Sequence, residues 1–248
     1  MRIEIITMWY NEEFLAPLFL RHYDFADAIT LLYDMDTTDS SLDMVRADPR
    51  VTVQPFRFPD GMDDALKQVK VNERYRASGA DWALLVDADE FLFWKREDTV
   101  VTDIRPLLET TGADIFTVQM LDVMRHRDDA DIDRSLPPLM QRRHGFGRGV
   151  KPCVVRTGRD FYWRAGCHEL VSTEQNTIVA DTLFGAHWAM ADPCFSIERR
   201  LKHRRARQSK YNLEKGLTSH NHHITLKDLQ REFAEGQDAP CLISAHCQ

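Results

Sequence analysis

Three carboxylates, Asp87, Asp89 and Glu90, stand together directly after the apolar run of residues 82–86. Aspartates one residue apart offer hard oxygen ligands, which suit Mg²⁺ or Mn²⁺ held together with the phosphates of a substrate. Because open α/β sheets bind ligands at the carboxyl ends of their strands, this position favours a functional site. The competing interpretation is a turn capped by Asp87 with the other carboxylates solvated. We expect the motif to lie at the surface end of its strand.

Two histidines could join this chemistry. His187 follows an apolar strand predicted over residues 178–184, and its imidazole nitrogen is a ligand that Mn²⁺ accepts. A buried structural histidine is the alternative. His168, within Gly166-Cys167-His168-Glu169, suits either metal binding or contact with a diphosphate, and the sequence does not decide between them.

A strongly basic stretch lies within a helix predicted over residues 196–217. In an α-helix, Arg200, Arg204 and Arg207 would share one face. Such a face could bind a diphosphate, an anionic membrane or lipid-linked acceptor, or nucleic acid, and a solvated surface helix is the alternative. The cationic residues of the stretch are Arg199, Arg200, Lys202, Arg204, Arg205, Arg207 and Lys210.

Strands that alternate with helices in the first part of the chain would position the acidic motif. A strand over residues 3–8, a helix over 11–25 capped by Asn11, and a strand over 28–33 form a predicted βαβ unit. A strand over residues 51–56, a helix over 62–77 and the strand over 82–86 follow. The last run is apolar at every position, as a strand buried on both faces should be. The alternation predicts an α/β fold.

The pattern changes after Glu90. Residues 125–149 are polar and contain consecutive prolines and the run Gly145-Phe146-Gly147-Arg148-Gly149, which predicts a mobile functional segment. The glycine run is interpreted as a flexible hinge because it lacks the Lys-Ser/Thr ending of a phosphate loop. The other predicted elements are helices over residues 102–110, 196–217 and 226–234, and strands over 115–121, 150–156, 161–164 and 177–187.

The composition is that of one soluble domain with a core. Of 248 residues, 43% are hydrophobic and 29% charged, and the formal net charge of -7 excludes a surface that binds polyanions everywhere. No apolar run is long enough to span a membrane. The 5 cysteines are widely spaced without a C-x-x-C pair, which argues against a disulfide framework or a thiolate zinc site and favours a reducing cytoplasm.

Several segments resemble the glycosyltransferases of the GT-A fold, in particular the family 2 group. The resemblance lies in residues 8–12 (MWYNE), 32–40 (LYDMDTTDS) and 81–91 (DWALLVDADEF), and more weakly in 166–170, 185–188 and 199–216. It implies a GT-A (Rossmann-like) mixed sheet flanked by helices, with C-terminal helices, in a single domain over residues 1–248. Within it, residues 1–95 would form the nucleotide-sugar-binding half, 96–190 the acceptor-binding half and 191–248 a C-terminal helical segment.

The same resemblance implies an activity. A sugar would pass from a nucleotide-sugar, we expect a UDP-sugar, to a hydroxyl of a glycan or lipid-linked saccharide, with inversion and with Mn²⁺ or Mg²⁺ bound. Asp89 would be the principal metal ligand, Asp87 would face the metal, ribose or sugar, and Arg204 would belong to a helix that closes over the diphosphate. The base and ribose pocket would contain Tyr10, Glu12, Asp34 and Asp36.

A transfer to a hydroxyl needs a general base within hydrogen-bond reach of that hydroxyl. Asp122, predicted at the end of a strand, and Glu169 are the candidates, and the resemblance favours Asp122. The basic stretch is the place where peripheral membrane contact is expected, and no nucleic acid partner is expected.

Two other functions compete with this hypothesis. An apolar strand followed by Asp-x-Asp is also the nucleophile signature of haloacid-dehalogenase-like phosphatases, but Phe91 stands where that family has Thr or Val, and their motif normally lies on the first strand. A non-catalytic anion-binding module using residues 199–210 is the second. It predicts that Asp87 and Asp89 are dispensable.

Overall fold

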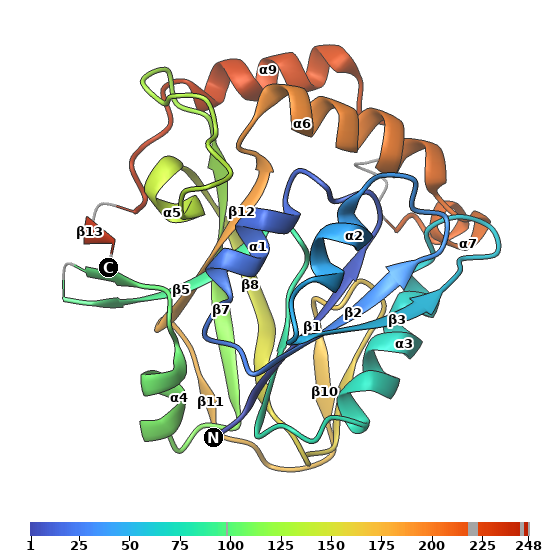
Figure 1. The fold of residues 1–248 in the computed structure, drawn as a ribbon, viewed down its shortest axis with the longest axis vertical. Coiled ribbons are helices and arrows are strands. Elements are labelled where there is room, and N and C mark those ends of the chain that lie inside the picture. The colour runs from blue at the N-terminus through green and yellow to red at the C-terminus, as the bar shows by residue number, and fades with distance from the viewer. Residues whose placement is uncertain (98, 218–222, 244–245, 248) are drawn as a thin grey trace.

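The computed structural model describes residues 1–97, 99–217, 223–243 and 246–247. Strands dominate the first 190 residues and short helices the rest (Figure 1). The strands are β1 Ile3–Trp9, β2 Ala28–Asp34, β3 Val51–Phe56, β4 Trp82–Leu85, β5 Glu90–Arg96, β6 Thr99–Val101, β7 Ile115–Met124, β8 His144–Arg156, β9 Phe161–Trp163, β10 Leu170–Ser172, β11 Ile178–Val179, β12 Leu183–Met190 and β13 His246–Cys247. The helices are α1 Ala16–His22, α2 Ser41–Arg46, α3 Asp64–Arg76, α4 Arg105–Thr110, α5 Pro138–Gln141, α6 Pro193–Ile197, the π-helical η1 Glu198–Arg204, the 3₁₀ turn η2 Arg205–Arg207, α7 Lys210–Glu214 and α9 Leu226–Gly236.

One mixed sheet organises the described chain. Its strand order is β13-β6-β5-β12-β7-β8-β4-β1-β2-β3, and β11 pairs with β7 off this path. The pairs of β1 with β2, β1 with β4, and β2 with β3 are parallel, whereas β8 runs antiparallel to both β4 and β7. The expected α/β fold, with a mixed sheet flanked by helices and with C-terminal helices, is confirmed.

The strand order reverses between β1 and β4. From β1 the chain adds β2 and β3 on one side and then returns to place β4 on the other side. Every residue of β4 is buried, as its apolar sequence predicts. In such sheets the carboxyl ends of the strands at the reversal leave a crevice for a ligand. The acidic motif follows β4 at this point.

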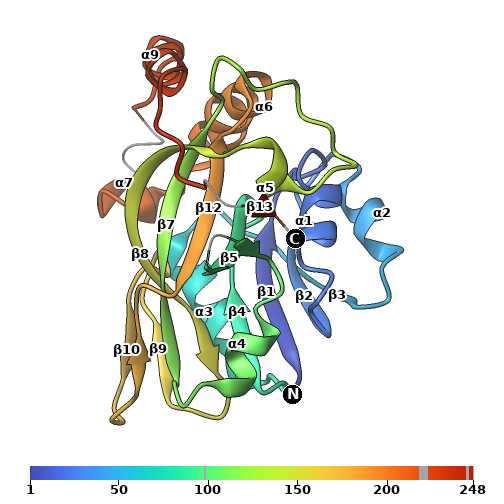
Figure 2. The ribbon, with the colours of Figure 1, turned by 90° about the vertical axis from the view of Figure 1, so that its left-hand side faces the viewer.

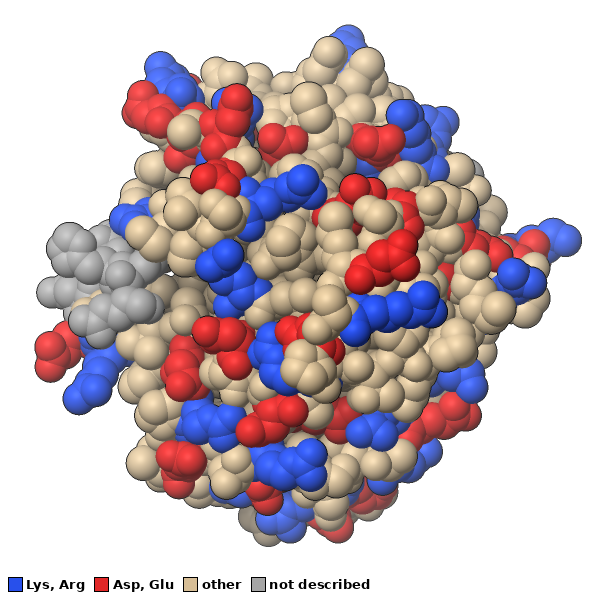
Figure 3. Space-filling model, viewed as in Figure 1, with Lys and Arg blue, Asp and Glu red and all other residues tan. Residues whose placement is uncertain are grey.

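Helices cover both faces of the parallel part of the sheet. Helices α1 and α2 lie on one face, and α3 with the β9–β10 hairpin lies on the other (Figures 1 and 2). Helices α6 and α9 lie at the end of the sheet opposite the N-terminus (Figure 1). The carboxyl end of β1 therefore points toward the C-terminal helices. On the face shown in Figure 3, acidic and basic side chains are interspersed, as the net charge leads us to expect.

The helix predicted over residues 11–25 is shorter than expected. Helix α1 begins at Ala16 with Leu15 in the cap position, so Asn11 is not its cap. Asn11 instead adopts a φ of 53° and accepts hydrogen bonds from the backbone amides of Thr38 (2.7 Å) and Asp39 (3.3 Å). Its side chain thus ties the loop after β1 to the loop after β2, next to the strand ends.

The mobile segment and glycine hinge predicted over residues 125–149 are partly wrong. The segment contains helix α5, and the glycine run forms the first half of β8, paired with β7. Gly145 is required there because a Cβ at this position would overlap the backbone oxygen of Asp122. The close approach of the two backbones explains a run that local composition marks as flexible.

The basic helix predicted over residues 196–217 is interrupted. Helix α6 passes into the π-helical η1 and the 3₁₀ turn η2, and Gln208 is extended before Ser209 caps α7. The wider π-turn changes which side chains share a face. No helix in the described ranges is long and apolar enough to cross a membrane.

Candidate active site

A cavity of about 430 Å³ opens at the carboxyl ends of β1, β2 and β4. Aromatic rings of Trp9, Tyr10 and Phe58 form part of its wall, and many of the other lining residues are charged, with both signs present. The charged lining residues are Glu12, Asp34, Asp64, Asp87, Glu90, Lys67, Arg148, Lys151, Arg199, Arg204 and Arg207. Cations that line a concave site beside aromatic rings suit a ligand that carries both phosphate and a ring system.

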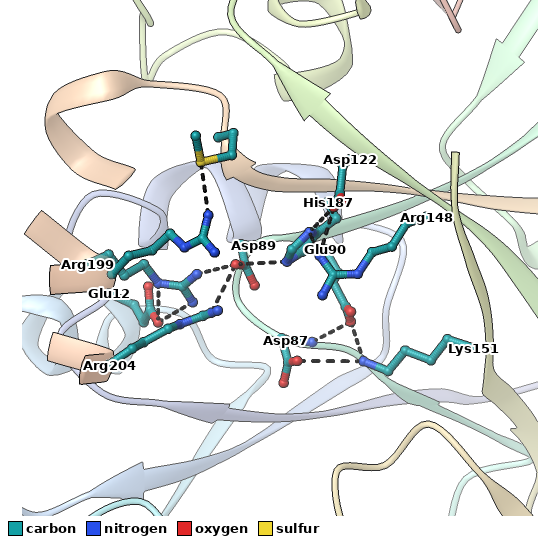
Figure 4. A network of polar contacts seen from close by, with 12 residues as sticks. Glu12, Asp87, Asp89, Glu90, Asp122, Arg148, Lys151, His187, Arg199 and Arg204 are labelled. Atoms are coloured by element: carbon teal, nitrogen blue, oxygen red, sulfur yellow. Dashed lines mark hydrogen bonds and ion pairs between the residues drawn. The ribbon is translucent and has the colours of Figure 1, made fainter. Parts of the chain in front are cut away.

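Asp89 lies behind the cavity wall with a relative exposure of 0%. The expectation that the motif sits at the surface is therefore wrong for this residue. Its Oδ2 accepts from Arg199, from Arg204 at 3.1 Å and from the ring of His187 at 3.4 Å (Figure 4). Burial alone would raise the pKa of Asp89, but Arg199 and Arg204 hold it well below its usual value. Oδ1 is buried and has no hydrogen-bond partner in the described part of the chain.

Asp87 and Glu90 are paired with two lysines. Asp87 Oδ1 lies 2.8 Å from Nζ of Lys67 and its Oδ2 lies 3.7 Å from Nζ of Lys151. The same Lys151 Nζ donates to Glu90 at 2.6 Å, and Glu90 in turn accepts from the backbone amide of Asp87 (Figure 4). Burial opposes the charge of Asp87, but Lys151 and Lys67 hold its pKa well below the usual value. Asp87 therefore faces the cavity as a paired carboxylate.

His187, Asp122 and Arg148 form a third group, from β12, β7 and β8. His187 Nδ1 lies 2.6 Å from Oδ1 of Asp122, and Arg148 Nη1 lies 2.8 Å from both atoms (Figure 4). Burial alone would lower the pKa of His187, but Asp89 and Asp122 raise it. Burial alone would raise the pKa of Asp122, but the hydrogen bonds from His187 and Arg148 bring it below its usual value. The pairing of β7 with β12, which sets His187 opposite Asp122, creates this contact.

Glu12, from the loop after β1, anchors Arg199. Its Oε1 accepts from Nε of Arg199 at 3.1 Å and from Nη2 at 2.7 Å. Burial raises the pKa of Glu12 to about 7, with Asp89 adding to the rise and Arg199 opposing it. Arg199 thus bridges Glu12 and Asp89, two residues that the sequence analysis placed in the site.

Arg207 contacts two of the other residues predicted for the nucleotide pocket, Tyr10 and Asp34. The Arg207 guanidinium lies 3.6 Å from the centre of the Tyr10 ring and 2.9 Å from Oδ2 of Asp34. Asp36 is farther from Arg207, at 3.7 Å, and pairs with Arg57 at 3.1 Å. Tyr10 and Asp34 line the cavity, whereas Asp36 is not among the described residues that do.

His168 and Glu169 are adjacent in sequence but separate in space. His168 lines the cavity, and burial lowers its pKa, with Lys151 acting in the same direction. The Glu169 side chain is 60% exposed and lies 3.4 Å from Arg164, and it is absent from the described lining. The structure therefore brings His168 to the other predicted residues and leaves Glu169 outside.

The basic stretch divides into inward and outward side chains. Arg199, Arg204 and Arg207 point into the cavity, a spacing of five and then three residues that follows the π-turn and the 3₁₀ turn. Arg200, expected on the same face, instead lies 2.8 Å from Glu232 of α9. Outside the cavity, Lys202 contacts Glu198 and Arg205 donates to the carbonyl of Ile224.

Three cationic residues of the site were not predicted. Lys67 comes from α3, and Arg148 and Lys151 come from β8. Lys67 and Lys151 are buried, which is rare for lysines without a partner. The sequence could have indicated Lys67 only as a lysine in the helix that precedes β4 and the acidic motif. No comparable local signal exists for Lys151, because the antiparallel pairing of β8 with β4 brings it beside the residues that follow β4.

The donor set offers two ligands for a divalent cation. His187 Nε2 faces Asp89 while its Nδ1 contacts Asp122, the outer-shell arrangement typical of a metal-binding histidine. The unpartnered Oδ1 of Asp89 is a free oxygen donor. Asp87 does not fit, since both of its oxygens contact lysines. Among the described residues, no three His, Cys, Asp or Glu side chains gather to hold a metal. Asp89 and His187 thus fit a cation whose other ligands come from a substrate.

No family model and no curated protein matches this sequence. Among solved structures, S. aureus TarS 1–349 in complex with UDP is 14% identical, with a TM-score of 0.43 over 73% of this chain and 60% of that chain. The same fragment with UDP-GlcNAc gives 14% identity and a TM-score of 0.43 over 95% and 79%. Glucosyl-3-phosphoglycerate synthase from Mycobacterium tuberculosis was solved with Mn²⁺, UDP and phosphoglyceric acid. It is 16% identical, with a TM-score of 0.33 over 48% of this chain and 43% of that chain. Likenesses at this level do not place the chain in a family.

Proposed function

We propose that the chain transfers a sugar from a nucleotide-sugar to an acceptor hydroxyl. The observation that carries this proposal is the cavity at the strand reversal, which Arg204, Arg207 and His187 line, with Asp89 buried behind its wall in contact with Arg204 and His187. Arginines recognise phosphate oxygens through paired N–H donors. A crevice outside the carboxyl ends of the strands is where open α/β sheets bind nucleotides.

The two ends of the cavity suit the two ends of the donor. The ring of Tyr10 and the carboxylate of Asp34 would contact the base and ribose, with Arg207 between them. The diphosphate would lie beside Arg204, and the sugar would reach Asp87 and His168. A carboxylate held ionised by Lys67 and Lys151 is a strong hydrogen-bond acceptor for sugar hydroxyls. We expect UDP as the nucleotide.

Asp89 and His187 would hold Mn²⁺ or Mg²⁺, with diphosphate oxygens completing the shell. When bound, the cation would stabilise the negative charge that develops on the leaving diphosphate. The lining cations and carboxylates are nearly balanced in number, so the protein alone offers a diphosphate little net positive charge. Asp87 would act on the sugar and not on the metal, in contrast to its predicted role as a metal ligand.

Asp122 is the general base that we propose, in preference to Glu169. Its side chain is 37% exposed and is held by His187 beside the metal ligands, so a substrate hydroxyl can reach a carboxylate of fixed orientation. An acceptor hydroxyl that attacks the sugar would give its proton to Asp122 as the bond from the sugar to the diphosphate breaks. We propose inversion, which requires that the hydroxyl attack the face of the sugar opposite the diphosphate. Glu169 is not among the described residues that line the cavity, and its neighbour is Arg164.

The acceptor would approach along the first half of β8. Phe146 and Val150 are exposed there on either side of Arg148, and an exposed aromatic ring can pack against a sugar face. We propose a glycan or a lipid-linked saccharide as the acceptor.

The test is a calorimetric titration of UDP, GDP, CDP and ADP into the wild-type protein, with Mn²⁺ and with EDTA. The proposal expects one nucleotide to bind, at least tenfold more tightly with Mn²⁺. Asp89→Asn, which keeps the shape and one hydrogen-bond acceptor, should lose this dependence on metal. Binding that is equal in EDTA and in Asp89→Asn would favour a non-catalytic anion-binding module, and no binding of any nucleotide would refute the proposal.

A further inference from the structure

We propose that Arg204 is a displaceable counter-cation of Asp89. Without ligand it holds Asp89, and when a divalent cation binds there Arg204 moves to the diphosphate. Metal and nucleoside diphosphate would then bind as a coupled pair. This inference rests on the proposed function and adds a device that controls when the metal site forms.

The two arginines on Asp89 are held very differently. Arg199 is only 6% exposed and is fixed by two hydrogen bonds to Glu12 besides its contact with Asp89. Arg204 is 31% exposed, lines the cavity, and has Asp89 as its only ion-pair partner in the described residues. Arg204 is therefore the arginine that can leave without breaking the Glu12 contacts.

The charges around Arg204 favour its release. Arg199 and Arg204 share one oxygen of Asp89, so two like charges compete for the same acceptor. A divalent cation on Asp89 would add repulsion, whereas a diphosphate in the cavity would offer Arg204 a stronger partner.

The backbone places Arg204 where such a movement is short. It ends the π-turn η1 and precedes the 3₁₀ turn η2, so two changes of helix type meet at its Cα. Single π-turns inside helices occur frequently at functional sites. Its side chain already lines the cavity, so a rotamer change is enough to exchange Asp89 for a ligand.

The protein offers few ligands to the cation, which explains why the release of Arg204 from Asp89 must coincide with nucleotide binding. The protein supplies Asp89 and His187 only, and no third donor joins them among the residues that the structure describes. Mg²⁺ and Mn²⁺ in such sites depend on phosphate oxygens to complete their shell. Metal alone must bind Asp89 against the charge of Arg204, whereas metal with diphosphate need not, because the diphosphate binds both the metal on Asp89 and the released Arg204.

The experiment measures Mn²⁺ affinity by electron paramagnetic resonance, with and without UDP, in the wild type and in Arg204→Met. Wild type should bind Mn²⁺ weakly alone and at least tenfold more tightly with UDP, within the usual range of coupling between two ligands, roughly 5–150-fold. Arg204→Met should bind Mn²⁺ alone about tenfold more tightly than wild type and should show a smaller effect of UDP.

Arg200→Met is the matched control, since Arg200 has the same kind of ion pair but faces Glu232 outside the cavity. Its Mn²⁺ affinity should equal that of wild type. Arg204→Lys keeps the charge and should restore the weak binding of Mn²⁺ alone, which a merely structural role of Arg204 would not require. If Arg204→Met and wild type bind Mn²⁺ alone equally, the inference is wrong.

Failure of the inference and failure of the proposed function are separable. The affinity of Arg204→Met for Mn²⁺ alone tests the counter-cation without any nucleotide. A wild-type protein that binds no nucleoside diphosphate would refute the proposed function whatever Mn²⁺ does.

Discussion

At the scale of residues, the three carboxylates of the acidic motif form ion pairs with side chains from several other elements. Asp89 contacts Arg199, Arg204 and His187. Asp87 and Glu90 pair with Lys67 and Lys151. Asp89 and His187 were predicted in the site because each follows an apolar strand, and the family resemblance added Glu12, Asp34 and Asp122. Sequence reasoning missed the counter-charges, because partners from α3 and β8 are chosen by strand pairing and burial, which no local pattern records.

Lys151 provides a test at this scale. It is buried between Asp87 and Glu90, so Lys151→Met leaves a buried carboxylate without its partner. The expected loss in the free energy of unfolding is about 3–5 kcal/mol, measured by urea denaturation.

The control is Lys70→Met, which breaks an exposed pair with Glu73 and should cost less than about 1 kcal/mol. Adding Glu90→Gln to Lys151→Met should recover part of the loss, because it removes the unpaired charge. Equal effects of Lys151→Met and Lys70→Met would contradict the role given to the buried pair.

At the scale of elements, the prediction of strands and helices succeeded where pattern and burial agree. The strands corresponding to β1, β2, β3 and β4 and the helix α3 were predicted to within a few residues. The strand β5 was missed, although residues 91–94 (FLFW) are apolar, because the acidic motif merges into it without a turn signal. The first half of β8 was predicted as a hinge because glycines are typical of flexible segments, whereas Gly145 serves close packing of β8 against the backbone of β7.

Gly145 tests this interpretation of β8. A Cβ there would overlap the backbone oxygen of Asp122, so Gly145→Ala must separate β7 from β8. We expect a loss of about 1–3 kcal/mol in the free energy of unfolding, as for an overpacked site.

Gly147 lies two residues along the same strand and serves as the control, because a Cβ added there would meet no atom of a non-adjacent residue within 4 Å. Gly147→Ala should change stability by less than about 0.5 kcal/mol. If both substitutions were equally tolerated by thermal denaturation, the tight approach at Asp122 would not exist in solution.

At the scale of the molecule, the strand order brings the functional loops to one edge. The loops after β1, β2 and β4 meet because these strands are parallel neighbours, and the C-terminal arginines reach the same edge through α6 and η1. The sequence predicted the first convergence from the alternation of strands and helices. The family resemblance implied the second, through a helix that closes over the diphosphate, but not which of its arginines point inward, because that depends on a π-turn that has no simple sequence signature.

Hydrogen bonds also join the acidic motif and β5 to the end of helix α1, which covers one face of the sheet. His22 Nε2 lies 2.7 Å from the carbonyl of Leu92 in β5, and Tyr23 donates to the carbonyl of Glu90 at 2.7 Å. Burial lowers the pKa of His22 to about 4 from 6.5, against the opposing hydrogen bond to Leu92. The folded protein therefore requires neutral His22 in the middle of the molecule.

This pKa shift predicts a pH dependence of stability. Between pH 6.5 and 4 the unfolded chain binds a proton at His22 that the folded chain refuses, so the contribution is present above pH 6.5 and is lost as the pH falls toward 4. The loss amounts to about 3 kcal/mol at about 1.4 kcal/mol per pKa unit. His22→Gln keeps a donor to Leu92 without this titration, so its stability should fall less steeply over the same range. Parallel pH profiles of the two proteins, measured by urea denaturation, would show that His22 is not responsible.

The measurement that tests the central claim most directly is the release of nucleoside diphosphate from a nucleotide-sugar that binds in the cavity. With Mn²⁺ and a UDP-sugar, the wild type should release UDP even when water is the only acceptor, since the metal and Arg204 act on the leaving group. Asp89→Asn should be slower by about a hundredfold or more, the usual effect of removing one group that stabilises developing charge. A bound UDP-sugar that the wild type cleaves no faster than Asp89→Asn would contradict the assignment of this cavity as the site of sugar transfer.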